Sequence, residues 1–103
     1  MNWKLFIDDE RWPKTNDWVI ARSSAEAIQA CHSHKSLPNE IAFDHDLGGD
    51  DTTMRFIVWL VDVLDDDDYQ IPADFTFSVH SQNPVGARNI QNYMENIIQE
   101  FRN

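Results

Sequence analysis

Acidic side chains follow two separate apolar runs of this sequence, and their types and spacing are those of a metal site. Asp8 and Asp9 directly follow one run, and the segment FDHD places Asp44 and Asp46 at the end of another. Carboxylates within a few Å of one another raise each other's pKa unless a cation relieves the repulsion. Oxygen ligands favour Mg²⁺, Mn²⁺ or Ca²⁺, and a histidine among them shifts the preference toward Mn²⁺ or Zn²⁺. We expect these four carboxylates to hold Mg²⁺ or Mn²⁺.

A simpler interpretation applies to each acidic motif alone. Acidic residues favour ordinary strand-to-loop transitions, and Gly48 and Gly49 make the segment FDHDLGGDD flexible enough for a solvated turn. Both motifs, however, directly follow predicted strands. In a parallel sheet such positions meet at the edge where ligands bind, and this favours the metal site.

A third polar segment, HSQNPVGAR at residues 80–88, follows a further apolar run. His80 and His45 can each donate or accept a proton near neutral pH. Ser81 is disfavoured as a nucleophile activated by His80, because adjacent residues of a strand point to opposite faces. We expect His80, Asp44 and His45 to carry the chemistry, with His45 left open between ligand, acid and bystander.

The same segment predicts a phosphate-binding helix start. Asn83 suits the N-cap and the following proline suits the first helical position, so unpaired N–H groups and partial positive charge face the sheet edge. Gly86 would let a ligand approach the backbone, and Arg88 adds a charge. We expect Ser81, Asn83, Gly86 and Arg88 to bind the substrate, although a capped, proline-started helix is also common without a ligand.

Short apolar runs predict the strands that position these residues, at 5–7, 18–21, 41–43 and 75–79. Three helices are predicted by their starts and by apolar side chains at helical spacing. They begin after Ser23, whose capping box includes Glu26, after Thr52-Thr53, and at Asn83-Pro84. The pattern predicts a small, open, mostly parallel α/β sheet of four strands with three helices.

One connection of this sheet is open to two interpretations. Residues 8–17 join the first two strands, and ten residues with Pro13 among them are too few for a normal crossover helix. Either this segment is a tight irregular crossover between parallel strands, or the first two strands pair antiparallel.

Length and composition limit the class of protein. The 103 residues suit a single domain over 1–103, and the single cysteine excludes an intramolecular disulfide. No signal sequence is visible and the longest apolar run, 56–61, is far below the roughly 20 residues a bilayer requires, so we expect a cytoplasmic protein without a membrane role. The net charge of −10 excludes an extended nucleic-acid surface and leaves an RNA terminus or small phosphorylated ligand as partner.

Four segments together resemble the cyclic-phosphate processing receiver-like domains. They are LFIDDER at 5–11, DWVIARSSAEAI at 17–28, FDHDLGGDD at 43–51 and VHSQNPVGARN at 79–89. The resemblance covers nearly the whole chain. It implies a receiver-like, flavodoxin-like fold without ordinary phosphorelay function, and a role in processing 2′,3′-cyclic phosphates of RNA ends or nucleotides.

The resemblance also assigns positions. The first two aspartates match the acidic pair of a receiver, Asp44 matches its phosphoacceptor, Asp46 is the second acid of the family's DHD, and HSQN at 80–83 matches its HSxN motif. Two features depart from the pattern. The double proline that often follows DDER is replaced by RWPK, and the lysine that a signalling receiver places after a fifth strand is absent, since no lysine follows Lys35.

Two functions from different classes follow. The first is a metal-dependent phosphoesterase in which the carboxylates hold the metal and His80 protonates the leaving ribose oxygen. The second is a catalytically inert receiver-like binding module, of the small acidic kind that a phage encodes, which binds a protein partner or a phosphorylated ligand. Trp3, Trp12 or Trp18 would be its contacts.

Overall fold

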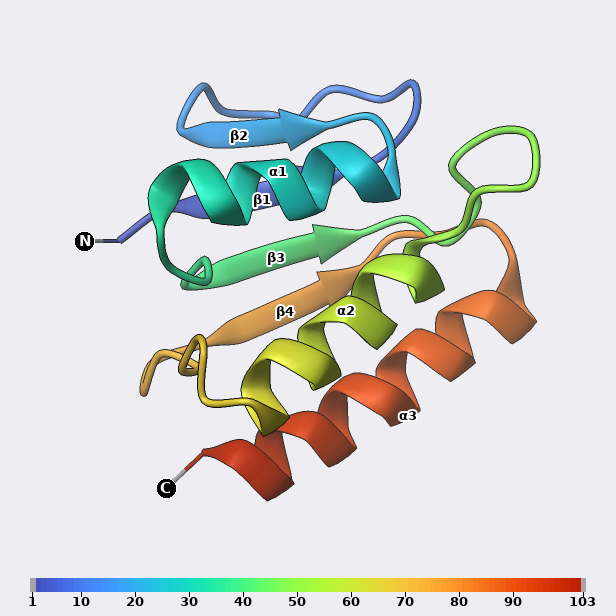
Figure 1. Ribbon diagram of the computed structural model, residues 1–103. Coiled ribbons are helices and arrows are strands. Elements are labelled where there is room, and N and C mark those ends of the chain that lie inside the picture. Colours follow the sequence, from blue (N-terminus) through green and yellow to red (C-terminus); the bar gives the residue numbers. More distant parts are fainter. Residues whose placement is uncertain (1, 103) are drawn as a thin grey trace.

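The computed structural model describes residues 2–102, which form one four-stranded sheet and three helices (Figure 1). The elements are, in order, β1 (Lys4–Ile7), β2 (Trp18–Ala21), α1 (Ser24–His34), β3 (Glu40–Phe43), α2 (Thr53–Asp65), β4 (Thr76–Val79) and α3 (Pro84–Phe101). The four strands and three helices predicted from the sequence are confirmed, and the strand bounds agree to within one residue.

All strand pairs are parallel, and the strand order is β2-β1-β3-β4. The chain runs from β1 outward to β2 and then returns to β3 on the other side of β1, so strand order reverses between β1 and β3. Residues 8–17 therefore form an irregular crossover between parallel strands, and the antiparallel alternative is excluded. Ligands of such sheets bind beyond the carboxyl ends of the strands at this reversal.

Side-chain caps fix two of the helix starts at this same edge. Ser23 Oγ accepts the backbone N–H of Glu26 at 3.1 Å, and Asn83 Oδ1 accepts that of Gly86 at 3.0 Å. Thr52 precedes α2 without a side-chain cap. The capped starts confirm the predicted capping residues and direct α1 and α3 away from the ends of β2 and β4.

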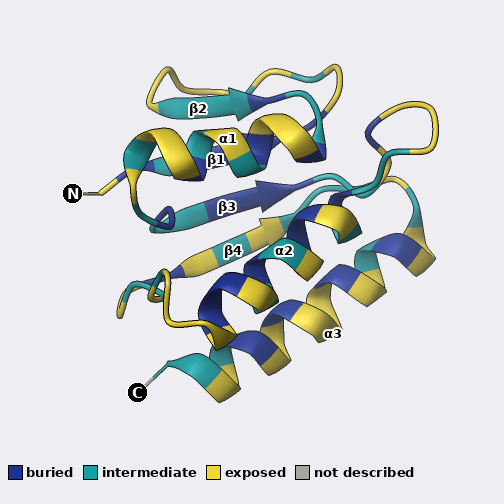
Figure 2. Ribbon diagram, in the orientation of Figure 1, coloured by how far each residue is buried: buried dark blue, intermediate teal, exposed yellow. Residues whose placement is uncertain are grey.

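The helices lie on the same side of the sheet and build the core with it (Figure 1). Alternate strand residues face this side, and Leu5, Ile7, Ile41 and Phe43 are at most 1% exposed. Each helix presents a buried stripe to them and an exposed face to solvent, which is clearest along α3 (Figure 2). Among these helices of residues 2–102, none has both the length and the apolar character that a membrane crossing demands.

The opposite face of the sheet is left largely uncovered. Its residues include Phe6, Ala42 and Ser78, which are paired in register across β1, β3 and β4 and stand outside the core cluster. Ser78 is exposed, whereas Phe6 and Ala42 are buried. A receiver-like sheet with helices on one side only is the consequence of a crossover at 8–17 that is too short to contain a helix.

Candidate functional site

The register of the sheet brings polar residues from neighbouring strands into one row. The N–H groups of Asp8, Asp44 and His80 donate to carbonyls of the adjacent strands at 3.1, 2.9 and 2.9 Å, which carries the ladder one residue beyond the strand ends. Arg22 follows β2 in the same row, because Ile7 pairs with Ala21. Parallel pairing therefore gathers an acid, a second acid, a histidine and an arginine at the carboxyl edge.

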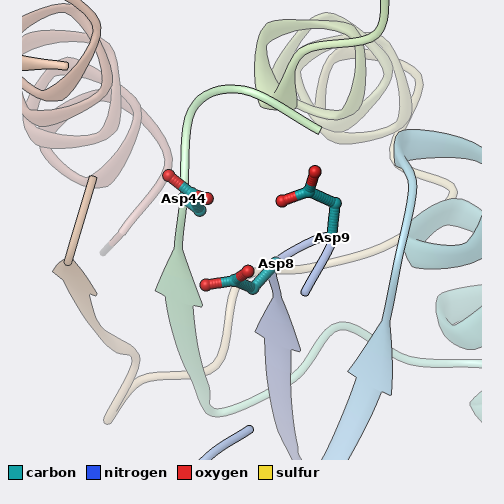
Figure 3. Close-up of side chains that lie close together, drawn as sticks. All are labelled: Asp8, Asp9 and Asp44. Atoms are coloured by element: carbon teal, nitrogen blue, oxygen red, sulfur yellow. The ribbon is translucent and has the colours of Figure 1, made fainter. Parts of the chain in front are cut away.

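Three carboxylates meet at the point where strand order reverses. Asp8, Asp9 and Asp44 each place one oxygen within 4.8 Å of the others (Figure 3). Asp8 is fully buried, Asp44 is half-buried and Asp9 is exposed, so the cluster opens to solvent on one side. Hard oxygen donors with this charge fit a divalent cation such as Mg²⁺ or Mn²⁺. We name these three residues the acidic cluster.

The buried carboxylate of Asp8 is held by three hydrogen bonds. Its Oδ1 accepts the backbone N–H groups of Glu10 and Arg11 at 3.0 and 2.9 Å, and its Oδ2 pairs with His80 Nε2 at 2.9 Å. Burial acts to raise the pKa of Asp8, but the two backbone donors and His80 outweigh it, so the pKa lies below its ordinary value. Asp8 is therefore ionised at neutral pH.

Asp44 is perturbed in the other direction. Burial, and then the negative charge of Asp8, raise the pKa of Asp44 above its ordinary value, against hydrogen bonds from the His45 N–H and the Ser81 side chain and the charge of His80. The His45 N–H lies 2.9 Å from Asp44 Oδ1. Keeping Asp44 ionised thus costs free energy, and a cation at the acidic cluster would offset this cost.

His80 connects the acidic cluster to the uncovered face of the sheet. Its ring stacks on Phe6 with centroids 5.0 Å apart and planes 10° apart, and its carbonyl accepts Arg11 Nη1 at 2.9 Å. Strand β3 lies between β1 and β4, so the ring reaches Asp8 and Phe6 across Ala42, whose small side chain leaves room. Because ionised Asp8 accepts a hydrogen bond from the Nε2–H group, Nδ1 is the nitrogen left for a ligand.

His45 and Asp46 lie together in a separate contact with α3. His45 Nδ1 is 3.0 Å from Asp46 Oδ1, and Asn83 Nδ2 donates to Asp46 Oδ2 at 3.4 Å. The His45 ring packs against Gly86 so closely that a Cβ there would lie 2.4 Å from His45 Cγ. Asp46 therefore lies outside the acidic cluster, and the Cβ side of Gly86 is occupied by His45. The metal role of Asp46 and the substrate contact of Gly86 stay predictions.

The other residues predicted to bind the substrate already take part in hydrogen bonds, with the exception of Arg88. The N–H groups of Gly86 and Ala87 donate to the side chain and carbonyl of Asn83, so these donors are already used. Ser81 Oγ accepts the Asn83 N–H at 3.0 Å, in addition to its bond with Asp44. Arg88 is exposed and makes no ion pair within residues 2–102, and its phosphate contact stays a prediction.

Two arginines that the sequence interpretation missed hold the site together. Arg22 Nη1 donates to the carbonyl of Asp8 at 3.0 Å and to that of Arg11, and Arg11 in turn binds the end of β4. Arg11 belongs to the motif DDER, and Arg22 directly follows a predicted strand as Asp8 does. The position of Arg22 was therefore a usable signal.

Comparison with known proteins identifies one family. The family model described as the cyclic-phosphate processing receiver domain matches residues 3–96. Neither a curated protein nor a solved structure matches the chain. The matched region contains all four strands, the acidic cluster and His80.

Asp44→Asn is expected to stabilise the metal-free protein at pH 7 by roughly 0.5–2 kcal/mol, the usual gain from removing an unfavourable charge. The folded state raises the pKa of Asp44, so ionising it costs stability as pH rises from the ordinary value through the raised one. The gain should therefore fade toward pH 4. Urea denaturation in EDTA between pH 4 and 7 measures it. Equal or lower stability of the variant at pH 7 would contradict the charge argument.

Asp8→Asn is the same substitution in the acidic cluster and is expected to have the opposite effect on stability. Its carboxylate accepts three hydrogen bonds and its pKa is lowered, so its stabilisation is present above the ordinary pKa and is lost as pH falls through the lowered one. In the same denaturation series this variant should be less stable than wild type at pH 7.

Gly86→Ala is expected to destabilise the protein by about 1–3 kcal/mol, the cost of overpacking, although alanine favours a helix. The reason is the contact between the new Cβ and the His45 ring. A double-mutant cycle with His45→Ala provides the check. The penalty should largely vanish when His45 is alanine, and a penalty that persists there would assign it to another neighbour.

Proposed function

The chain belongs to the cyclic-phosphate processing receiver family, and on that premise we propose that it is a metal-dependent phosphoesterase that opens 2′,3′-cyclic phosphates. The observation that carries the proposal is the Asp8–His80 pair at the edge of the acidic cluster. A proton-transfer group and a set of cation ligands thus share one carboxylate. Both kinds of group can assist the opening of a cyclic phosphodiester, the first by protonating the leaving oxygen and the second by holding a cation beside the phosphoryl group.

Asp8, Asp9 and Asp44 would hold the cation, which is Mg²⁺ or Mn²⁺ by the chemistry of the donors. When bound, it would polarise a phosphoryl oxygen and offset the charge of the carboxylates. The residues themselves support this assignment. Asp8 stays ionised through its backbone donors, and the raised pKa of Asp44 reflects burial and the neighbouring charge of Asp8.

His80 would move the proton. Ionised Asp8 holds Nε2 of the imidazole at 2.9 Å, so that Nδ1 of the protonated ring would donate to the ribose oxygen that leaves phosphorus. Stacking on Phe6 and the bond from Arg11 to the His80 carbonyl keep the ring in this orientation. Water adds to phosphorus, and the products are a phosphomonoester and a free ribose hydroxyl.

The experiment that tests the proposal follows a nucleoside 2′,3′-cyclic phosphate by ³¹P NMR in the presence of Mg²⁺ or Mn²⁺. We expect the cyclic signal to give way to one regioisomeric monophosphate, and the product to be absent with Asp44→Asn. A cyclic signal that stays unchanged with both metals would reject the phosphoesterase and favour the inert binding module.

His80→Gln separates proton transfer from metal binding. Glutamine can still donate to Asp8 but cannot exchange a proton, so turnover should fall by about 10²- to 10⁴-fold while Mg²⁺ still raises the melting temperature. His32→Gln, on the exposed side of α1, is the matched control and should keep full turnover. Loss of both turnover and metal stabilisation in His80→Gln would assign His80 to the metal site instead.

A further inference from the structure

The uncovered face of the sheet carries an open groove beneath the β1–β2 crossover. Its volume is about 460 Å³, within the roughly 300–1,000 Å³ of small-molecule sites. Phe6, Trp12 and Trp18 line it, and the Trp12 side chain is 74% exposed. Trp12 is the exposed member of the three, whereas Phe6 is buried and Trp18 is half-buried. Aromatic side chains that line an open groove are typical of small-molecule sites.

The charge of this groove is opposite to that of the protein. Lys4, Arg11 and Lys14 line it, and none of the described lining residues is acidic, although the whole chain has only eight basic residues and a net charge of −10. Lys4 Nζ is neutralised by Asp17 at 3.0 Å and by Glu40 at 3.8 Å, whereas Lys14 has no ion pair within residues 2–102, so the positive charge of the groove rests on Arg11 and Lys14. The groove therefore favours a ligand that is both aromatic and anionic.

His80 makes the groove continuous with the acidic cluster. It is a lining residue of the groove, its ring stacks on Phe6, and its Nε2 is 2.9 Å from Asp8 Oδ2. A ligand that spans both regions would place a flat ring system among the aromatic side chains and a phosphate beside the carboxylates and their cation.

We propose that the groove binds the base and ribose of a single nucleotide whose phosphate lies at the acidic cluster, an inference that rests on the proposed function. Arg22 lies over one face of the Trp12 ring, 4.6 Å from its centroid, and the exposure of the ring leaves the other face for a base. Stacking on aromatic side chains accepts any base. The groove volume and the acidic remainder of the surface favour one nucleotide over a longer RNA.

The test uses adenosine 3′-monophosphate with Mg²⁺, because this ligand has a base, a ribose and a phosphate but no cyclic bond. In ¹H–¹⁵N spectra the indole signals of Trp12 and Trp18 should shift. Those of Trp3, which donates to Ser36 at 3.0 Å on the far edge, and of Trp59 on α2 should not. Shifts confined to Trp3 or Trp59, or no shifts, would overturn the proposal.

Affinity measured by calorimetry gives the second readout. Trp12→Ala should weaken binding of adenosine 3′-monophosphate by roughly ten-fold or more, as the loss of one stacked base does. Tyr93→Ala removes an exposed aromatic side chain from α3 and should leave the affinity unchanged. Ribose 5-phosphate, which has no base, should bind wild type roughly ten-fold more weakly or worse.

Each contrary result has a defined meaning. Equal affinity for the two compounds, or equal effects of the two variants, would reject the groove as a base site. Tighter binding of a short RNA with a 3′-phosphate would replace the single nucleotide as occupant. Nucleotide binding without turnover of a cyclic phosphate would support the groove as a base site and reject the phosphoesterase. Equally efficient turnover of a cyclic phosphate without a base would support the phosphoesterase and reject the groove as a base site.

Discussion

The carboxylate of Asp8 is the group on which the rest of this site depends. A buried ion costs several kcal/mol unless hydrogen bonds satisfy it, and Asp8 is satisfied by two amides of its own loop and by His80 from the far side of β3. The same three bonds fold the start of the crossover, fix the histidine ring and keep a negative charge beside Asp44. The structure of the loop, the orientation of the His80 ring and the charge of the acidic cluster thus all depend on this one carboxylate.

A crossover without a helix gives this receiver-like domain an uncovered sheet face. Residues 8–17 connect parallel strands in ten residues, and the carbonyls of Asp8 and Arg11 are held by the guanidinium of Arg22 in place of helical hydrogen bonds. The strand residues on that side are consequently free of a second helical layer. Aromatic and basic side chains gather there, next to an edge that is acidic.

The sequence predicted the fold and the acidic cluster because both follow from local patterns. Apolar runs mark the strands, and residues that directly follow parallel strands must meet at one edge. The pairing of His80 with Asp8 could not be predicted, because it crosses β3 and depends on strand order. The separation of Asp44 from Asp46 could not be predicted either. Side chains alternate between the two faces only as far as Phe43, where β3 ends, and the chain beyond it places Asp46 against His45 beside α3.

The segment FDHDLGGDD shows how one charge run serves several purposes once the chain is folded. Asp44 joins the acidic cluster, Asp46 pairs with His45 beside α3, and Asp51 accepts the backbone N–H of Ser24 at 2.8 Å at the start of α1. The last two aspartates lie near helix starts, where a negative charge is favourable. Asp44 is held where burial and the charge of Asp8 oppose its ionisation and raise its pKa. Ionising Asp44 therefore costs free energy in the folded protein, and a cation bound at the acidic cluster would offset that cost.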